Sequence, residues 1–89
     1  MKIKLYKNKT YIVNRDNEEY TFNLGEKDIQ EHGFQVVDHL VESILQYLKN
    51  KEEIFVEGTG LQSRMIGRKL EDKVKRDIVY IDENKTVYL

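Results

Sequence analysis

The chain has 89 residues, enough for one domain with a modest core, and its 39% apolar and 35% charged residues are typical of a globular protein rather than a disordered one. It contains no cysteine, which excludes disulfides, thiolate catalysis and cysteine-based zinc sites. No apolar run is long enough to span a membrane or to form a signal peptide, so we expect a cytoplasmic protein.

The formal net charge of −1 conceals two segments of opposite charge. Residues 26–53 hold seven acids against three bases, a balance of −4. Residues 64–76 hold six bases against two acids, a balance of +4. This segregation predicts one acidic helix and one basic helix.

The first 24 residues have the composition of three short strands, at residues 2–6, 10–14 and 20–24. The first two runs flank a plausible tight turn, "KNK", and "NRDNEE" separates the second from the third. These residues predict a three-stranded meander.

Residues 34–50 carry the strongest periodic signal in the chain. Apolar residues recur there at alternating spacings of three and four, which predicts an amphipathic helix. We expect Val41, Ile44 and Leu48 to be buried, and the first residue of the stripe, Phe34, to share their face.

The remaining elements follow from shorter patterns. Residues 54–56 predict a buried strand, and 61–75 predict a second helix whose inner face is formed by Leu61, Met65, Ile66, Leu70 and Val74. Within this helix Gly67 indicates close packing, because glycine costs about 1 kcal/mol there relative to alanine. The runs "DIVYI" and "KTVYL" predict a closing hairpin. We therefore expect a single α+β domain over residues 1–89, a two-layer sandwich in the order βββ-α-β-α-ββ, with two helices on one face of a mostly antiparallel sheet.

The turn Gly58-Thr59-Gly60 lies between the predicted strand and the second helix. It lacks the third glycine of a dinucleotide fingerprint and the Gly-Lys-Ser/Thr of a P-loop. Free backbone N–H groups at the helix start, with the Thr59 and Ser63 hydroxyls and Arg64, can still hold a backbone phosphate. The alternative is a strand-to-helix corner whose glycines only supply positive φ.

The second helix also presents a basic outer face. Arg64, Arg68 and Lys75 share one side, and Lys69, Lys73 and Arg76 lie beside them. Such a face binds nucleic acid in a salt-dependent manner. The alternative is a solvated helix whose charges pair with one another.

We expect no catalytic residue, no metal site and no cofactor. His32 and His39 lack a third plausible ligand nearby, and no serine, histidine and acid form an activated nucleophile. Tyrosines in the strands, such as Tyr11, Tyr20 and Tyr80, offer either a base-stacking face or ordinary sheet packing.

The predicted first helix, the strand "EIFVEG", the turn "GTG", the segment "LQSRMIGRKLEDKV" and the closing hairpin together resemble the Alba-like α/β domain. The resemblance covers residues 19–89 and leaves residues 1–17 as an added N-terminal hairpin. In that family a Ser/small–Arg/Lys pair begins the second helix, and Ser63-Arg64 occupy that place here. The loop "GEKDIQEHG" before the first predicted helix departs from the family pattern, because it offers Lys27 among Glu26, Asp28 and Glu31 and would repel phosphates. Translation-factor and CRM-type RNA-binding folds have a similar element order.

The resemblance implies a homodimer that binds DNA or RNA without catalysis. The predicted contacts with the phosphate backbone come from the turn and the basic helix: Gly58, Thr59, Gly60, Ser63, Arg64, Arg68, Lys69 and Lys75. The alternative function is a protein-interaction or regulatory module in which the two oppositely charged helices pair with a protein partner or across a dimer.

Overall fold

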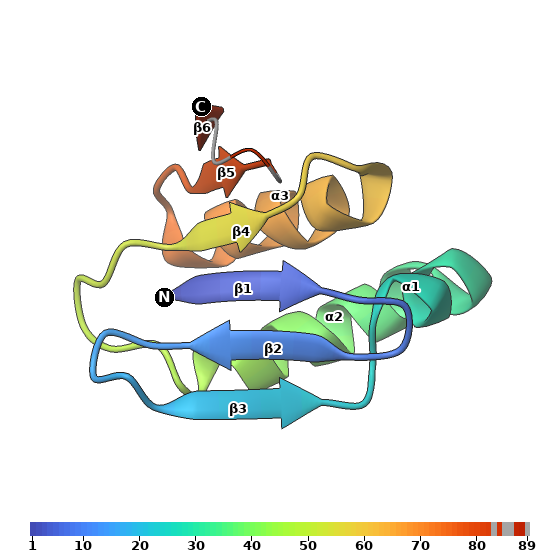
Figure 1. Ribbon diagram of the computed structural model, residues 1–89, viewed down its shortest axis with the longest axis horizontal. Coiled ribbons are helices and arrows are strands. Elements are labelled where there is room, and N and C mark those ends of the chain that lie inside the picture. The colour runs from blue at the N-terminus through green and yellow to red at the C-terminus, as the bar shows by residue number, and fades with distance from the viewer. Residues whose placement is uncertain (83, 85–86, 89) are drawn as a thin grey trace.

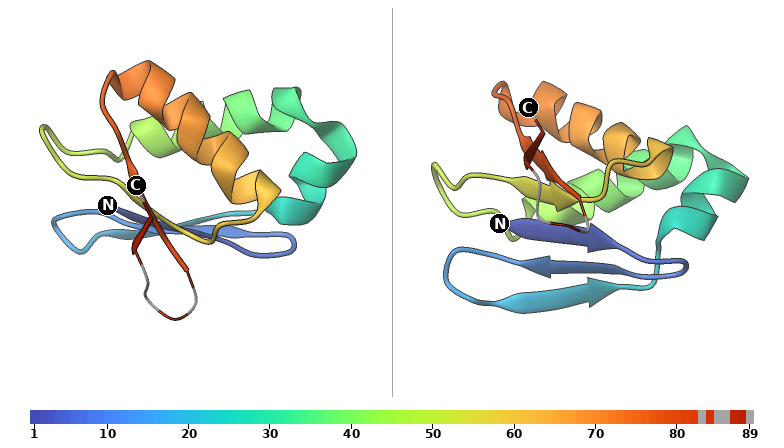
Figure 2. Two further views of the ribbon diagram at one scale, coloured as in Figure 1. Left: turned by 90° about the horizontal axis from the view of Figure 1, so that it is seen from above. Right: turned by 45° about the horizontal axis from the view of Figure 1, so that its top comes forward.

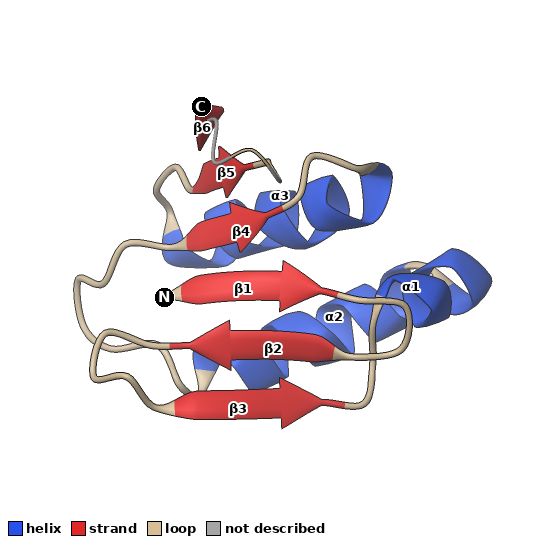
Figure 3. Ribbon diagram, in the orientation of Figure 1, coloured by secondary structure: helices blue, strands red, loops and turns tan. Residues whose placement is uncertain are grey.

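The computed structural model describes residues 1–82, 84 and 87–88. Six strands and three helices are present in this part of the chain (Figure 1; Figure 3 distinguishes them by colour). In chain order they are β1 (Lys2–Leu5), β2 (Thr10–Val13), β3 (Glu19–Phe22), α1 (Glu26–His32), α2 (Phe34–Leu45), β4 (Phe55–Glu57), α3 (Leu61–Val74), β5 (Val79–Ile81) and β6 (Val87–Tyr88). Of the predicted hairpin run 85–89, residues 85, 86 and 89 lie outside the described residues.

The strands form one sheet in the order β3-β2-β1-β4-β5-β6. The sheet was expected to be mostly antiparallel, but at its centre β1, β4 and β5 run parallel. The antiparallel pairs β1–β2, β2–β3 and β5–β6 lie to either side. A parallel centre results because α1 and α2 return the chain to the start of β1, so that β4 runs beside it, and α3 carries β4 over to β5. Since β1 lies between β2 and β4, the N-terminal hairpin is part of the sheet's centre rather than an addition to its edge.

All three helices cover one face of the sheet (Figure 2), which gives the expected two layers. The expectation of two helices was wrong, since the acidic segment before the first predicted helix forms α1. Its acids favour a helix start: the Gly25 N–H donates a hydrogen bond of 2.9 Å to the Asp28 carboxylate, and negative charge is stabilising in a first turn. Gly33, with φ of 67°, ends α1 and begins α2. Helix α2 ends at Leu45, five residues before the predicted end at 50.

The core lies between the sheet and the helices. Val41, Ile44, Ile66 and Leu70 are buried as predicted. Leu48 is half-buried, because it lies beyond the end of α2 and packs at the border of the core.

Two residues of the predicted inner faces are exposed instead. Phe34 is 78% exposed and Leu61 is 70% exposed. Each is the first residue of its helix, and side chains on a helix point back toward its N-terminus, beyond the layer that the sheet covers.

The prediction of close packing at Gly67 is confirmed. A Cβ atom at this position would overlap the ring of Tyr80, which is buried beneath α3. Among the described residues, no helix is long and apolar enough to cross a membrane.

Candidate functional site

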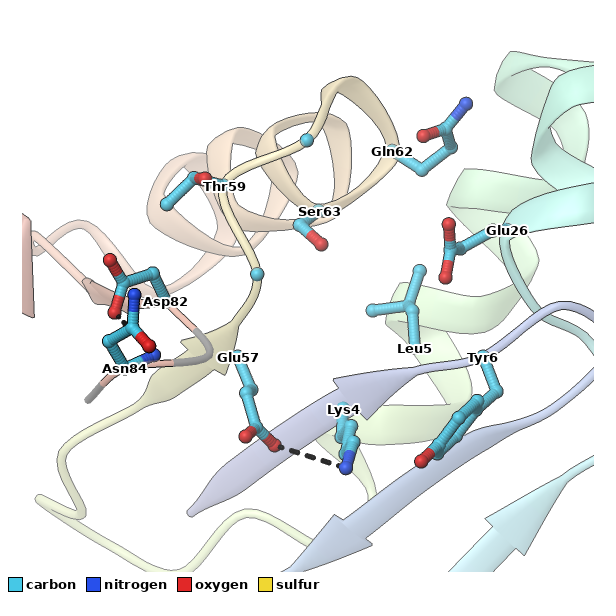
Figure 4. A pocket seen from close by; sticks show the side chains of 12 residues that line it. Lys4, Leu5, Tyr6, Glu26, Glu57, Thr59, Gln62, Ser63, Asp82 and Asn84 are labelled. Carbon is cyan, nitrogen blue, oxygen red and sulfur yellow. Dashed lines mark hydrogen bonds and ion pairs between the residues drawn. The ribbon is translucent and has the colours of Figure 1, made fainter. Parts of the chain in front are cut away.

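The carboxyl ends of the three parallel strands meet at one edge of the sheet, beside the N-terminus of α3. From there the chain leaves β1 toward β2 and leaves β4 in the opposite direction, toward α3 and β5. Ligands of open α/β sheets bind in the crevice that such diverging connections leave. A pocket of about 700 Å³ opens here (Figure 4). It is lined by Lys4, Leu5, Tyr6, Glu26, Glu57, Gly58, Thr59, Gly60, Gln62, Ser63, Asp82 and Asn84.

The turn after β4 requires glycine at only one of its two glycine positions. Gly58 has φ of 120°, a conformation that other residues rarely adopt, and its N–H donates a 2.6 Å hydrogen bond to the Ile81 carbonyl. A Cβ atom on Gly58 would also lie 2.6 Å from the Ser63 Oγ. Gly60 has φ of −71° and open space around it. The corner interpretation therefore explains Gly58 through its positive φ, and Gly60 through its place as the N-cap of α3, where glycine is favoured.

Ser63 presents a hydroxyl group to the pocket from the first turn of α3. Only 7% of the residue is exposed, and Figure 4 shows its side chain directed into the pocket. Within the part of the chain that the structure describes, this hydroxyl has no hydrogen-bond partner. A hydroxyl group that faces a pocket without a partner in the described chain can donate a hydrogen bond to a ligand. The absent side chain of Gly58 leaves the room that this hydroxyl occupies.

The backbone at the start of α3 adds donors to the same place. The first helical hydrogen bond runs from the Arg64 N–H to the Gly60 carbonyl, at 3.0 Å. Gly60 has no side chain to cap the helix, so the N–H groups that precede Arg64 receive no capping side chain. The helix dipole places partial positive charge at this end, which favours an anionic ligand.

The floor and rim of the pocket carry charged and aromatic groups. Lys4 and Glu57 are neighbours on β1 and β4, with the Lys4 Nζ 3.9 Å from a Glu57 carboxylate oxygen. The Lys4 Nζ also lies 4.8 Å from the centroid of the Tyr6 ring. Glu26 from α1 and Asp82 after β5 add two further acids. The described residues contain no cluster of three potential ligands that would hold a metal ion by itself.

The lysines of α3 that face α2 are engaged within the chain. The Lys69 Nζ lies 3.0 Å from an Asp38 carboxylate oxygen, and the Lys73 Nζ lies 3.2 Å from one of Glu42. The hydrogen bond with Asp38, together with its negative charge, raises the pKa of Lys69. The acidic and basic helices thus pair with each other in one molecule.

The arginines of α3 lie apart from the Gly58–Gly60 turn. The Arg64 guanidinium lies 4.4 Å from the centroid of the Tyr80 ring, and Arg64 and Arg68 border a second hollow of about 350 Å³. Glu71 and Asp77 line that hollow as well. Burial and the charge of Glu71 raise the pKa of Tyr80, and the two arginines act in the opposite direction.

The eight predicted site residues therefore separate into groups. The structure brings Gly58, Thr59, Gly60 and Ser63 together around one pocket. It places Arg64 and Arg68 at the second hollow, pairs Lys69 with α2, and leaves the Lys75 Nζ 3.7 Å from its helix neighbour Asp72.

Sequence reasoning missed the pocket residues contributed by β1, α1 and the end of β5: Lys4, Tyr6, Glu26 and Asp82. A signal was present, because two short apolar strands flanking a single helix are typical of a βαβ unit with parallel strands. Once β4 and β5 are taken as parallel, the residues at their carboxyl ends become site candidates.

No model of a known family, no curated protein and no solved structure matches this chain. The resemblance to the Alba-like domain therefore stays a prediction.

Proposed function

We propose that this chain binds the phosphate group of a nucleotide at the turn 58–60, without chemical change to the ligand. The Ser63 hydroxyl, which faces the pocket without a hydrogen-bond partner among the described residues, is the observation that carries the proposal. A phosphate oxygen at the start of α3 accepts hydrogen bonds from this hydroxyl and from the uncapped N–H groups of the first turn.

The size and the aromatic rim of the pocket favour a nucleotide over inorganic phosphate. A volume of about 700 Å³ lies within the range of small-molecule sites and far exceeds one phosphate group. Tyr6 lines the pocket and is 49% exposed, and its ring makes an edge-on contact with Tyr11, at 5.6 Å between ring centroids. Stacking of a base on such a ring contributes about 1–3 kcal/mol.

Because the side chains around the pocket are mostly acidic, we expect a divalent cation to bind together with the phosphate. Lys4 is the one lysine or arginine among the residues that line it, against Glu26, Glu57 and Asp82. A bare phosphate would meet repulsion there. Mg²⁺ is commonly held by one or two carboxylates together with the phosphates of a ligand, so no complete protein cluster is needed. We therefore expect the nucleotide to bind as its magnesium complex.

The nucleotide has two possible sources: a free mononucleotide or one unit of a DNA or RNA strand. The second source is the nucleic-acid binding that the Alba-like resemblance implies. The ion pairs of Lys69 and Lys73 with α2 occupy cations that a strand along α3 would need. For this reason the proposal rests on the turn rather than on the outer face of α3.

Calorimetric titration with three kinds of ligand tests the proposal in the presence of Mg²⁺: tripolyphosphate, the common mononucleotides and single-stranded oligonucleotides. Ser63→Ala removes one hydroxyl and is expected to weaken binding of every phosphate ligand about tenfold, the usual effect of one hydrogen bond to a charged group. Ser43→Ala is the matched control, because the Ser43 hydroxyl donates to the His39 carbonyl on α2. It should leave binding unchanged.

The ligand series separates the two sources. Mononucleotide binding that an oligonucleotide does not exceed identifies a free nucleotide. Oligonucleotide binding that grows with strand length and falls steeply with salt identifies a nucleic-acid strand. Absence of binding by all three ligands, or equal affinity of Ser63→Ala and the unaltered chain, contradicts the proposal and leaves the protein-interaction module as the function to pursue.

A further inference from the structure

The face of the sheet opposite the helices has no covering layer in the described part of the chain (Figure 2). Residues alternate between the two faces of a strand, so the buried Val56 and Tyr80 point to the helices and their neighbours point away. The half-buried Val13, Phe55, Val79 and Ile81 are absent from the residues that pack against the core. They lie on this open face.

Apolar residues on both faces are typical of strands that are covered on both sides. Sheets of parallel strands occur almost only where both faces are covered, since their strands are apolar throughout. The central strands β4 and β5 are parallel and carry Phe55, Val79 and Ile81 on the open face. The face therefore has the chemistry of an interface rather than of a solvated surface.

The hydrogen-bonding register arranges the open face in two rows across the sheet. One row runs Glu19, Val13, Lys2, Phe55 and Val79, from β3 to β5. The other runs Thr21, Tyr11, Lys4, Glu57 and Ile81. The boundary between β1 and β4 divides both rows.

Most positions of the two rows complement each other across that boundary, and the exception is Lys2, which comes onto Phe55. If a second copy is turned about this boundary, Val13 of one copy faces Val79 of the other, and Tyr11 faces Ile81, so that apolar side chains meet. The same turn also brings Lys4 onto Glu57, base onto acid. This is the pairing that a twofold axis along the strands creates between two copies, because such an axis exchanges the sides of the sheet and keeps the position along the strand.

We propose that two copies of this chain associate through their open sheet faces about a twofold axis parallel to β1 and β4. In this dimer Val13 of each copy contacts Val79 of the other, and Lys4 of each pairs with Glu57 of the other. The charges Lys2, Lys4, Glu19 and Glu57 balance, so the face does not repel its own copy. This interface differs from the helix-to-helix dimer expected from the sequence, because it rests on apolar contacts. Its Lys4–Glu57 pair, like the pairs between α2 and α3, also forms within one chain.

The size of the face sets the expected affinity. Five strands about 4.8 Å apart, with three or four residues each, cover roughly 24 by 12 Å. This area, about 290 Å² per copy, is smaller than that of standard specific interfaces, so we expect a weak, transient dimer with a dissociation constant on the order of 100 μM. Sedimentation equilibrium over a concentration series should then show a shift from the 10.7 kDa chain to twice that mass.

A charge-reversal pair tests the register. Val79→Glu places a carboxylate opposite Val13 of the second copy and should weaken association at least about tenfold, because an unpaired charge enters the interface. Adding Val13→Lys should restore it. Within one chain these two positions are three strand spacings apart, about 14 Å, so the introduced charges pair only between copies.

Phe34→Glu is the control, since Phe34 is the most exposed large apolar side chain described and lies on α2, away from the open face. It should leave association unchanged, and circular dichroism verifies that each variant is folded. A chain that stays monomeric at hundreds of micromolar contradicts the proposal and assigns the face to another protein. A dimer that survives Val79→Glu, that is lost in Phe34→Glu, or that Val13→Lys does not restore contradicts it as well.

Discussion

Polar groups at the two ends of the parallel strands differ in whether they have partners within the chain. At the amino ends of β1 and β4, the Met1 ammonium lies 2.7 Å from a Glu52 carboxylate oxygen and donates to the Glu53 carbonyl. The other Glu52 oxygen accepts from the Lys49 N–H, and the Arg76 guanidinium donates to the Glu52 carbonyl. At the carboxyl ends, the Ser63 hydroxyl faces a pocket without a partner in the described chain.

This difference predicts which polar groups contribute to the stability of the fold and which are available to a ligand. Polar groups that are engaged with one another by hydrogen bonds and ion pairs fix the geometry of the sheet and are not available to a ligand. A polar group that is held in place without a partner in the described chain is one that a ligand can engage. Variants at the amino edge should therefore alter the free energy of unfolding and spare binding, and variants at the carboxyl edge should alter binding.

The largest effect is expected at Glu52, whose side chain is 2% exposed. Glu52→Gln removes the charge that faces the Met1 ammonium and leaves that ammonium buried. Breaking a buried ion pair in this way costs about 3 kcal/mol of stability. Urea denaturation measures the loss, and nucleotide titration under native conditions should show unchanged affinity. Glu53→Gln, at the exposed neighbouring side chain, should leave stability nearly unchanged. A comparable loss in both variants would contradict a specific role for the buried pair.

The same carboxylate predicts how stability depends on pH. Burial raises the pKa of Glu52, but hydrogen bonds from the Met1 ammonium and the Lys49 N–H outweigh burial, so its pKa lies below the ordinary value of 4.5. A carboxyl group with a lowered pKa in the folded state contributes stability that is complete above its unfolded pKa. That stability is lost as the pH falls below about 4.5 and through the lowered value. Denaturation midpoints at a series of pH values should fall there, and Glu52→Gln should flatten this part of the curve.

A smaller effect is expected at the carboxyl edge, in the comparison of its two glycines. Gly58→Ala forces a side chain into positive φ and against the Ser63 hydroxyl, and strain of this kind costs about 1–3 kcal/mol. Gly60→Ala replaces a helix N-cap glycine that has ordinary φ and open space, so it should cost less than about 1 kcal/mol. Nucleotide affinity should fall in Gly58→Ala, because Ser63 must move, and should persist in Gly60→Ala. Equal losses of affinity would show that the turn, rather than the Ser63 position, determines binding.

Much of the fold was predictable from the sequence because it follows from local periodicity. The strands at 54–56 and 77–81 and the helix over 61–75 agree with the structure to within two residues at each end. The sheet's strand order was not predictable in this way, because which strand β4 pairs with depends on the whole chain. The acids of residues 26–31 were interpreted as a loop, although their position after Gly25 is that of a helix first turn.

The candidate site was predictable in part for the same reason. Gly58 to Ser63 are contiguous, so one local motif identifies them. Lys4 and Glu57 meet through the pairing of β1 with β4, across more than fifty positions of sequence, and composition carries no trace of that contact. The α3 lysines show the converse case: their charge is obvious from the sequence, but the carboxylates that engage them lie on another helix.

The smallest effect is expected at the contact between α2 and α3, where Lys69 faces Asp38. Both side chains are partly exposed, and ion pairs of this kind contribute little to stability and are screened by salt. A double-mutant cycle of Lys69→Ala and Asp38→Ala should therefore give a small favourable coupling at low salt that fades as salt is added. Since Asp38 raises the pKa of Lys69, the stabilising contribution is complete below the ordinary lysine pKa of 10.5 and is lost as the pH rises through the higher folded value. Nucleotide and oligonucleotide affinities should be the same in Lys69→Ala as in the unaltered chain, because this ammonium is engaged by α2. A fall in oligonucleotide affinity, with mononucleotide affinity retained, would instead show that a strand runs along α3, as the Alba-like resemblance implies.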